Sequence, residues 1–142
     1  MTTSSPSTSS TEHGTLHGTA LSVSLTVKDL EQSLAWYEEV AGLSVDQKYE
    51  REGKVTAIAL RAGTVRVLIN QDDGGRGWDR VKGEGFSLQI TTEQNLDELA
   101  SGIKTRGGAL ASEPADMPWG VRMFRLVDPD GYRWTISSPK FA

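Results

Sequence analysis

The sequence predicts an α+β protein built from two βαβββ modules, because the same order of strand and helix patterns occurs twice along the chain. Each half has an alternating strand pattern, one helical stripe and three further strand patterns, and a glycine-rich, charged segment separates the halves. A module's helix covers only one face of its sheet, so the other face stays open. We therefore expect two curved mixed sheets whose open faces enclose a partly polar cavity.

The first module is predicted over residues 20–71. Apolar and hydroxyl side chains alternate from Leu21 to Val27, which is the period-2 pattern of a half-buried strand. Asp29 is a candidate helix N-cap, and apolar residues at helical spacing then continue to Ala41 before Gly42 ends the helix. Strand patterns follow at residues 44–51, 55–61 and 64–70, with turns at Glu52-Gly53 and Ala62-Gly63.

The second module is predicted over residues 85–139. Alternation resumes from Phe86 to Ile90, and a helical stripe from Leu96 to Ile103 ends at Gly107-Gly108. Strand patterns are found at 109–113, 121–127 and 132–137, with a loop at 114–120 and a turn at Asp128-Pro129-Asp130-Gly131. The two halves match weakly: Ser24-Leu25 corresponds to Ser87-Leu88 at an offset of 63, and residues 63–69 to 131–136 at 67 or 68.

The rest of the chain is a tail and a connection. Residues 1–18 are rich in Ser, Thr and Gly without apolar periodicity, which predicts a flexible tail ahead of a single domain over residues 19–142. Residues 72–84 carry several glycines and charges and are predicted to form a linker or a lid.

Composition limits the class of partner. The 142 residues are 37% hydrophobic and 24% charged, and no apolar run approaches the roughly 20 residues that span a bilayer. The net charge of -4 does not favour nucleic acid as a partner. The chain has no cysteine, and its N-terminus lacks the basic and apolar stretches of a secretory signal. We expect a cytoplasmic protein that does not bind membranes.

Two segments resemble a known family. VKDLEQSLAWYEEVAGL (27–43) is similar to the opening strand and helix of the vicinal oxygen chelate superfamily, which includes glyoxalases, bleomycin resistance proteins and dioxygenases. PWGVRMFRLVDPDGYRWTI (118–136) is similar to the closing hairpin of that family. With the repeat, the resemblance extends from about residue 20 to residue 139, and it implies the paired-module fold.

The resemblance also implies where a metal would bind. In metal-dependent members His, Gln or Glu ligands project from the first and last strands of each module, and these positions correspond here to Ser22, Leu68, Gly85 and Thr135. None of the four is a usual ligand of a divalent cation. We therefore expect no metal, no other cofactor and no catalytic residues, and the sequence leans away from an enzyme.

A cavity without a metal must recognise its ligand by shape, stacking and hydrogen bonds. Trp78 and Trp119 lie in predicted loops, where they are candidates for stacking on a planar ligand, although anchoring or a dimer contact is a nearly equal alternative. Trp36 and Trp134 are predicted to be core residues. The predicted ligand-binding residues are Ser22, Ser24, Thr26, Arg66, Leu68, Asn70, Trp78, Ser87, Gln89, Trp119 and Thr135; each polar strand residue among them could instead face solvent.

Other candidate sites have simpler interpretations. His13 and His17, the two histidines, are both in the predicted tail and are expected to be solvated. Asp72-Asp73 could bind a cation, but such a pair more often caps a loop and faces water.

Three functions stay open at this point. The first is a metal-independent homodimer that encloses an aromatic or heteroaromatic small molecule, as antibiotic-sequestering members of the resembled family do. The second is a lyase, isomerase or dioxygenase with an atypical metal site, and the third is a partner-binding dimer with a filled cavity.

Overall fold

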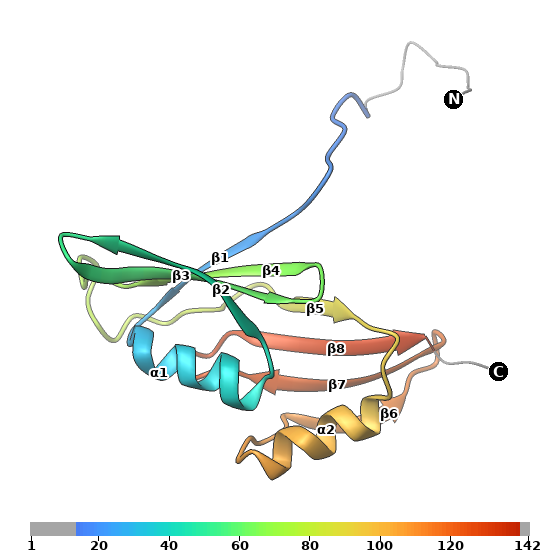
Figure 1. Cartoon of the computed structure of the whole chain (residues 1–142). Coiled ribbons are helices and arrows are strands. Elements are labelled where there is room, and N and C mark those ends of the chain that lie inside the picture. Colours follow the sequence, from blue (N-terminus) through green and yellow to red (C-terminus); the bar gives the residue numbers. More distant parts are fainter. Residues whose placement is uncertain (1–13, 140–142) are drawn as a thin grey trace.

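Two four-stranded mixed sheets form the protein, as Figure 1 shows. The computed structural model describes residues 14–139. The sheets have the strand orders β1-β4-β3-β2 and β5-β8-β7-β6, so each sheet belongs to one predicted module and the α+β class is confirmed. The elements are β1 (Val23–Val27), α1 (Leu30–Ala35), η1 (Trp36–Val40), β2 (Ser44–Arg51), β3 (Lys54–Ala62), β4 (Val65–Gln71), β5 (Leu88–Thr91), α2 (Leu96–Thr105), β6 (Ser112–Asp116), β7 (Val121–Val127) and β8 (Arg133–Pro139).

Both sheets have the same topology. The first strand of each module pairs in parallel with the last strand, and the other pairs are antiparallel. The register differs from the sequence repeat, however, because Leu25 lies beside Ile69, whereas Ile136, the counterpart of Ile69 at an offset of 67, lies beside Ile90 rather than Leu88. A two-residue shift keeps every side chain on its own face of the sheet, so alternation alone could not detect it.

The first helix begins and ends where the sequence predicts, but its last turn is wider than expected. The Asp29 carboxylate accepts a hydrogen bond from the Gln32 N–H at 3.1 Å, as an N-cap does. The helix continues as the π-helix η1, in which the Ala41 N–H donates to the Trp36 carbonyl at 2.9 Å. π-turns inside α-helices are often found at functional sites.

The second module differs from its prediction at two strands. β6 covers Ser112–Asp116, so the strand predicted over 109–113 is displaced and part of the predicted 114–120 loop is extended. β6 is an edge strand that pairs only with β7, and an edge strand tolerates Pro114 although proline has no N–H to donate. β5 begins at Leu88, so Phe86 and Ser87 precede it.

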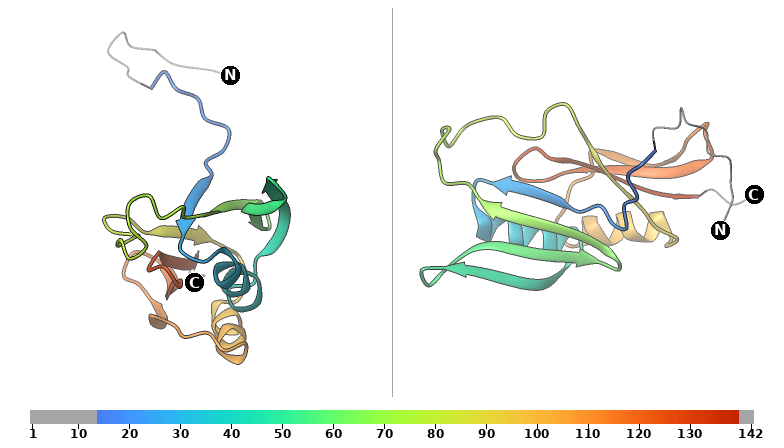
Figure 2. Two further views of the ribbon diagram at one scale, coloured as in Figure 1. Left: turned by 90° about the vertical axis from the view of Figure 1, so that its left-hand side faces the viewer. Right: turned by 90° about the horizontal axis from the view of Figure 1, so that it is seen from above.

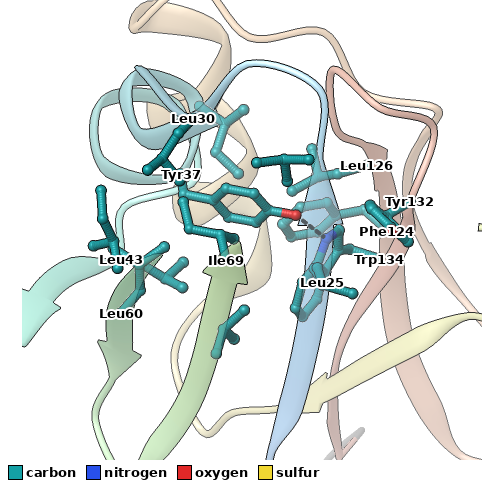
Figure 3. Packing of buried hydrophobic residues seen from close by; sticks show 14 of the residues in the cluster. Leu25, Leu30, Tyr37, Leu43, Leu60, Ile69, Phe124, Leu126, Tyr132 and Trp134 are labelled. Carbon is teal, nitrogen blue, oxygen red and sulfur yellow. Dashed lines mark hydrogen bonds between the residues drawn. The ribbon is translucent and has the colours of Figure 1, made fainter. Parts of the chain in front are cut away.

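One hydrophobic core joins the modules, and Figure 3 shows its centre. Tyr37 of η1 reaches the second module, where its ring lies 5.9 Å from the ring of Trp134. The Tyr37 hydroxyl donates to the Asp128 carboxylate and accepts a hydrogen bond from the Trp134 indole N–H at 3.1 Å. Trp134 is 5% exposed, which confirms its predicted core position, whereas Trp36 is only partly buried.

α1 and the second sheet both lie on the core side of the first sheet (Figure 2). The open face of each sheet is therefore turned away from the shared core. Within residues 14–139, no helix is long and apolar enough to cross a membrane.

Candidate functional site

The open face of the first sheet carries most of the predicted ligand-binding residues. Leu25 and Ile69 point into the core, so the alternate residues Ser24, Leu68 and Asn70 lie on the open face. Ser24 and Leu68 are cross-strand partners, and the Asn70 amide nitrogen donates to the Ser24 hydroxyl at 2.7 Å. These side chains form a neutral floor with a hydroxyl, an amide and one apolar group.

A β-bulge adds an aromatic residue to this floor. Val45 pairs with Leu60, a core residue, but Gln47 pairs with Ala59, so the extra residue between them reverses the facing of the following residues. Tyr49 therefore lies opposite Ala57 on the open face and is 43% exposed. Simple alternation would have placed it with Val45, and the sequence offers no clear signal for the bulge.

Arg66, also predicted as a ligand contact, already has partners on this face. Its guanidinium forms an ion pair with Asp46, the residue at the bulge, and Asp46 also lies 3.7 Å from the Arg61 guanidinium. More than half of the Arg66 side chain is exposed, so this pair forms at the surface. Arg66 reaches a ligand only if this pair opens or is shared.

Thr26 lies where the floor ends, beside a hollow that the sequence did not indicate. The hollow has a volume of about 600 Å³, and its lining includes Thr26 and three arginines, Arg51, Arg76 and Arg80. The Thr26 carbonyl accepts a hydrogen bond from the Tyr132 hydroxyl at 2.8 Å, which joins this edge to the second module. The arginines come from β2 and from the connection between modules, so only the tertiary structure brings them together.

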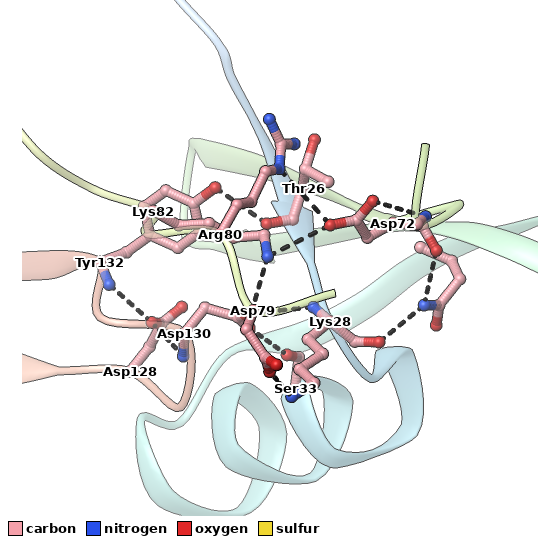
Figure 4. A network of polar contacts seen from close by, with 12 residues as sticks. Thr26, Lys28, Ser33, Asp72, Asp79, Arg80, Lys82, Asp128, Asp130 and Tyr132 are labelled. Carbon is pink, nitrogen blue, oxygen red and sulfur yellow. Dashed lines mark hydrogen bonds and ion pairs between the residues drawn. The ribbon is translucent and has the colours of Figure 1, made fainter. Parts of the chain in front are cut away.

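Asp72 and Asp73, the acidic pair at this edge, lie in different environments. Asp72 is 4% exposed, and its carboxylate lies 3.2 Å from the Lys82 ammonium, which in turn lies 3.9 Å from Asp130 (Figure 4). The Gly74 N–H, aided by Lys82 and Arg80, holds the pKa of Asp72 below its usual value. Asp73 is exposed and accepts from the Gly75 N–H at 2.8 Å. Both residues cap the loop as predicted, but Asp72 faces Lys82 rather than water.

The second sheet presents a smaller set of predicted residues. Gln89 of β5 lies opposite Thr135 of β8, and Thr135 lies opposite Arg125 of β7. Thr135 is 4% exposed and Gln89 is exposed, so the amide is the more accessible of the two. Ser87 is exposed and lies one residue before β5, outside the strand that was predicted to present it.

The four positions that the resemblance assigned to metal ligands do not lie together. Ser22 and Gly85 precede β1 and β5, and Gly85 has a φ of 82° in a turn. The residues beside Leu68 and Thr135 are Ser24 and Gln89 instead. Gln89 offers one amide oxygen, and the other three offer two hydroxyls and an alkyl group, which do not fit a divalent cation. No group of three or more His, Cys, Asp or Glu side chains within residues 14–139 is placed to hold a metal.

The two loop tryptophans lie at opposite ends of β7. Trp119 is at the turn before β7 and is 67% exposed. Trp78 is 50% exposed and packs on Gly74 in the connection between the modules. Lys28 joins this connection to the β7–β8 turn, because its ammonium donates to Asp79 and its backbone N–H donates to Asp130. Seven strand residues span roughly 23 Å, so one small ligand cannot contact both tryptophans of the same chain.

One of the two histidines can be placed in the structure. His17 is exposed ahead of β1, and His13 lies outside the described residues.

Comparison with known proteins assigns the family. A sequence model of the Glyoxalase/Bleomycin resistance protein/Dioxygenase superfamily matches residues 15–136. A lactoylglutathione lyase of Arabidopsis thaliana is 27% identical over 116 residues, which are 78% of this chain but 40% of that protein, so the chain spans about two fifths of its relative.

Solved structures show the same fold. A superfamily member from Sphaerobacter thermophilus is 20% identical with a TM-score of 0.70, and the match covers 86% of this chain and 98% of the other. TioX from Micromonospora sp. ML1 is 20% identical with a TM-score of 0.64, over 87% of this chain and 98% of TioX. The chain belongs to the Glyoxalase/Bleomycin resistance protein/Dioxygenase superfamily.

Proposed function

We propose that this protein binds a small aromatic or heteroaromatic molecule on its open sheet faces without a metal, in the manner of an antibiotic-sequestering protein. The observation that carries the proposal is the chemistry at the centre of each face. Ser24, Leu68 and Asn70 on one sheet and Gln89 and Thr135 on the other provide neutral hydrogen-bonding groups and an apolar contact. The ligand is a small organic molecule rather than a nucleic acid or a membrane.

Enclosure of the ligand requires a second surface, which we propose is a second copy of the chain. The helices and the shared core occupy the inner side of both sheets, so open-face side chains such as Tyr49 and Gln89 face solvent in one chain, although Thr135 and Met123 of the second sheet are only 4% and 7% exposed. A homodimer that opposes the first sheet of one copy to the second sheet of the other would close two equivalent cavities. Small-molecule sites usually bury most of the ligand surface.

The aromatic residues of the open faces would provide stacking. Tyr49 lies on the floor itself, beside the small side chains Ala57 and Ala59, which leave room for a planar ring. Trp78 and Trp119 would contact the ligand from opposite ends of the groove, one from each copy. A stacked aromatic pair contributes about 0.5–1.5 kcal/mol beyond burial.

A cytoplasmic location is part of this proposal. The 142-residue chain contains no cysteine, which is compatible with a reducing compartment.

Catalysis is a second candidate because of the similarity to a lactoylglutathione lyase. A lyase, isomerase or dioxygenase activity would require a metal site different from the one that the family implies, since the residues beside Leu68 and Thr135 do not provide a ligand set.

Elemental analysis of the purified protein separates the two candidates. We expect far less than one equivalent of Zn, Ni, Mn or Fe per chain, and a tightly held equivalent would favour the enzyme. Light scattering should give twice the 15.4 kDa mass of one chain. A monomer at micromolar concentration would contradict the dimer-enclosed cavity.

Ligand binding is tested with a panel of planar antibiotics and heteroaromatic metabolites, followed by tryptophan fluorescence. Leu68→Trp should occupy the space above the floor and abolish ligand binding. Gln89→Ala should weaken ligand binding several-fold, with little loss of stability because Gln89 is exposed. Gln32→Ala is the matched control, since Gln32 is exposed on α1 away from both open faces. If no compound changes the emission or the melting temperature, the protein is not a binder of this class.

A further inference from the structure

We propose a second ligand site, separate from the open faces, in a cleft between the modules on the helix side, and infer that it takes a planar aromatic carboxylate. The cleft has a volume of about 770 Å³. Its walls come from η1 and the β3–β4 turn of the first module and from β5, α2 and the core strands of the second. It is lined by Trp36, Tyr37, Ile90, Leu99 and Arg106 among others.

Small residues in the first module keep the cleft open. Ala41 and Gly42 follow η1, and Ala62 and Gly63 lie where β3 ends, so these four positions add almost no side-chain volume to the edges that approach the second module. Gly42 has a φ of 87°, and a β-carbon built there would lie 3.6 Å from the Arg106 guanidinium. The cleft is therefore open because these positions hold small residues.

The π-turn builds the aromatic wall. The wide turn presents the consecutive residues Trp36 and Tyr37, whose ring centroids lie 4.8 Å apart and nearly perpendicular. The Trp134 indole N–H donates to the Tyr37 hydroxyl, which donates to the Asp128 carboxylate, so these polar atoms are satisfied away from a ligand. Tyr37 is 1% exposed and Trp134 5%, so the accessible ring surface of the wall is that of the partly buried Trp36, which favours a planar aromatic guest.

Arg106 supplies the charge at the rim. One of its terminal nitrogens donates to the Val40 carbonyl at 3.0 Å, which fixes the guanidinium at the end of η1. Arg106 forms no ion pair with any residue among 14–139, so its remaining N–H groups can bind an anion. Glu93 also lies on the rim, and it forms no ion pair with any residue among 14–139. The held cation selects a carboxylate on the aromatic guest.

The test uses calorimetric titration of the full chain with 2-naphthoate and with its neutral analogue 2-naphthamide. We expect the wild type to bind both probes. Arg106→Gln should weaken naphthoate about tenfold, the effect of losing one charged hydrogen bond worth about 1.4 kcal/mol, and leave naphthamide unchanged. Equal effects of Arg106→Gln on both probes, or none on naphthoate, would overturn the carboxylate assignment.

Two blocking variants place the site. Leu99→Trp places a large ring in the cleft from α2, and Thr64→Trp does so at the exposed rim without touching the core. Each variant should abolish the Arg106-dependent component of 2-naphthoate binding. Leu68→Trp on the open face should leave that component intact, so failure of this site and failure of the proposed function are distinguishable. Binding that survives both cleft variants refutes the site. A change of oligomeric mass in Thr64→Trp without probe binding would assign the cleft to a contact between copies instead.

Discussion

Asp128 is a single carboxylate that holds both modules. It accepts hydrogen bonds from the Tyr37 hydroxyl of the first module and from the Tyr132 and Asp130 N–H groups of its own turn. Burial raises the pKa of Asp128 above its usual value of 3.8, although these donors act in the opposite direction. Burial and the neighbouring Asp128 charge likewise raise the pKa of Tyr37.

The raised pKa of Asp128 predicts a pH dependence of stability. The folded state favours protonated Asp128, so its contribution is fully present below pH 3.8 and is lost as the pH rises through the raised pKa. Asp128→Asn should lack this loss, and urea unfolding of both proteins from pH 3.5 to 8 measures the difference. Asp72 titrates identically in both proteins and cancels. Parallel stability curves would show that Asp128 ionises normally.

The different exposures of Trp134 and Trp119 predict a large and a small effect of alanine substitution on the free energy of unfolding. Trp134→Ala should cost about 3–5 kcal/mol of unfolding free energy, because it removes a buried ring and its hydrogen bond to Tyr37. Trp119→Ala should stay within about 0.5 kcal/mol, because Trp119 is 67% exposed, yet it should weaken ligand binding. Chemical denaturation measures the unfolding free energy of each variant. Equal losses of stability would argue against a stacking role for Trp119.

At the scale of elements, the connection between modules is docked at a close backbone approach. Gly83 has a φ of 79°, and a β-carbon built there would lie 2.8 Å from the Gly131 carbonyl oxygen. The connection that was predicted to be a linker or lid is held at this point by Lys82, whose side chain is 5% exposed between Asp72 and Asp130. A lid movement of residues 72–84 would have to break these buried contacts.

Two alanine substitutions measure this docking. Gly77→Ala should cost about 1–2 kcal/mol, because Gly77 has a φ of 91° but no atom within 4 Å of the added carbon. Gly83→Ala should cost more, because the same backbone strain is joined by a clash with the backbone of the β7–β8 turn. Thermal or urea unfolding of the pair compares them directly, and a similar loss in both would mean that the connection is loosely held.

Some features of single elements follow from nearby residues in the sequence, whereas others depend on pairing between strands. The order of elements, the N-cap at Asp29 and the turn at Glu52-Gly53 follow from spacing and residue type within a few positions. The facing of Tyr49 does not, because it depends on a bulge that forms only when β2 pairs with β3. The displaced start of β6 likewise depends on its pairing with β7.

At the scale of the whole molecule, the two modules share one hydrophobic core. A single cluster of buried side chains joins Leu25 and Ile69 of the first module to Phe124 and Trp134 of the second. We therefore predict that urea unfolding followed by far-UV circular dichroism and by tryptophan fluorescence gives coincident transitions. Two separated transitions would show that the modules unfold independently.

The order of strand and helix patterns predicted two βαβββ modules, and alternation predicted the facing of the β1 and β4 residues but not that of Tyr49. These properties depend on local periodicity and residue chemistry. Strand pairing and packing place Ser24 and Gln89 beside Leu68 and Thr135, set Trp78 and Trp119 at opposite ends of β7, and open the cleft between the modules. Those features arise from pairing and packing between distant residues, for which neighbouring positions in the sequence give no signal.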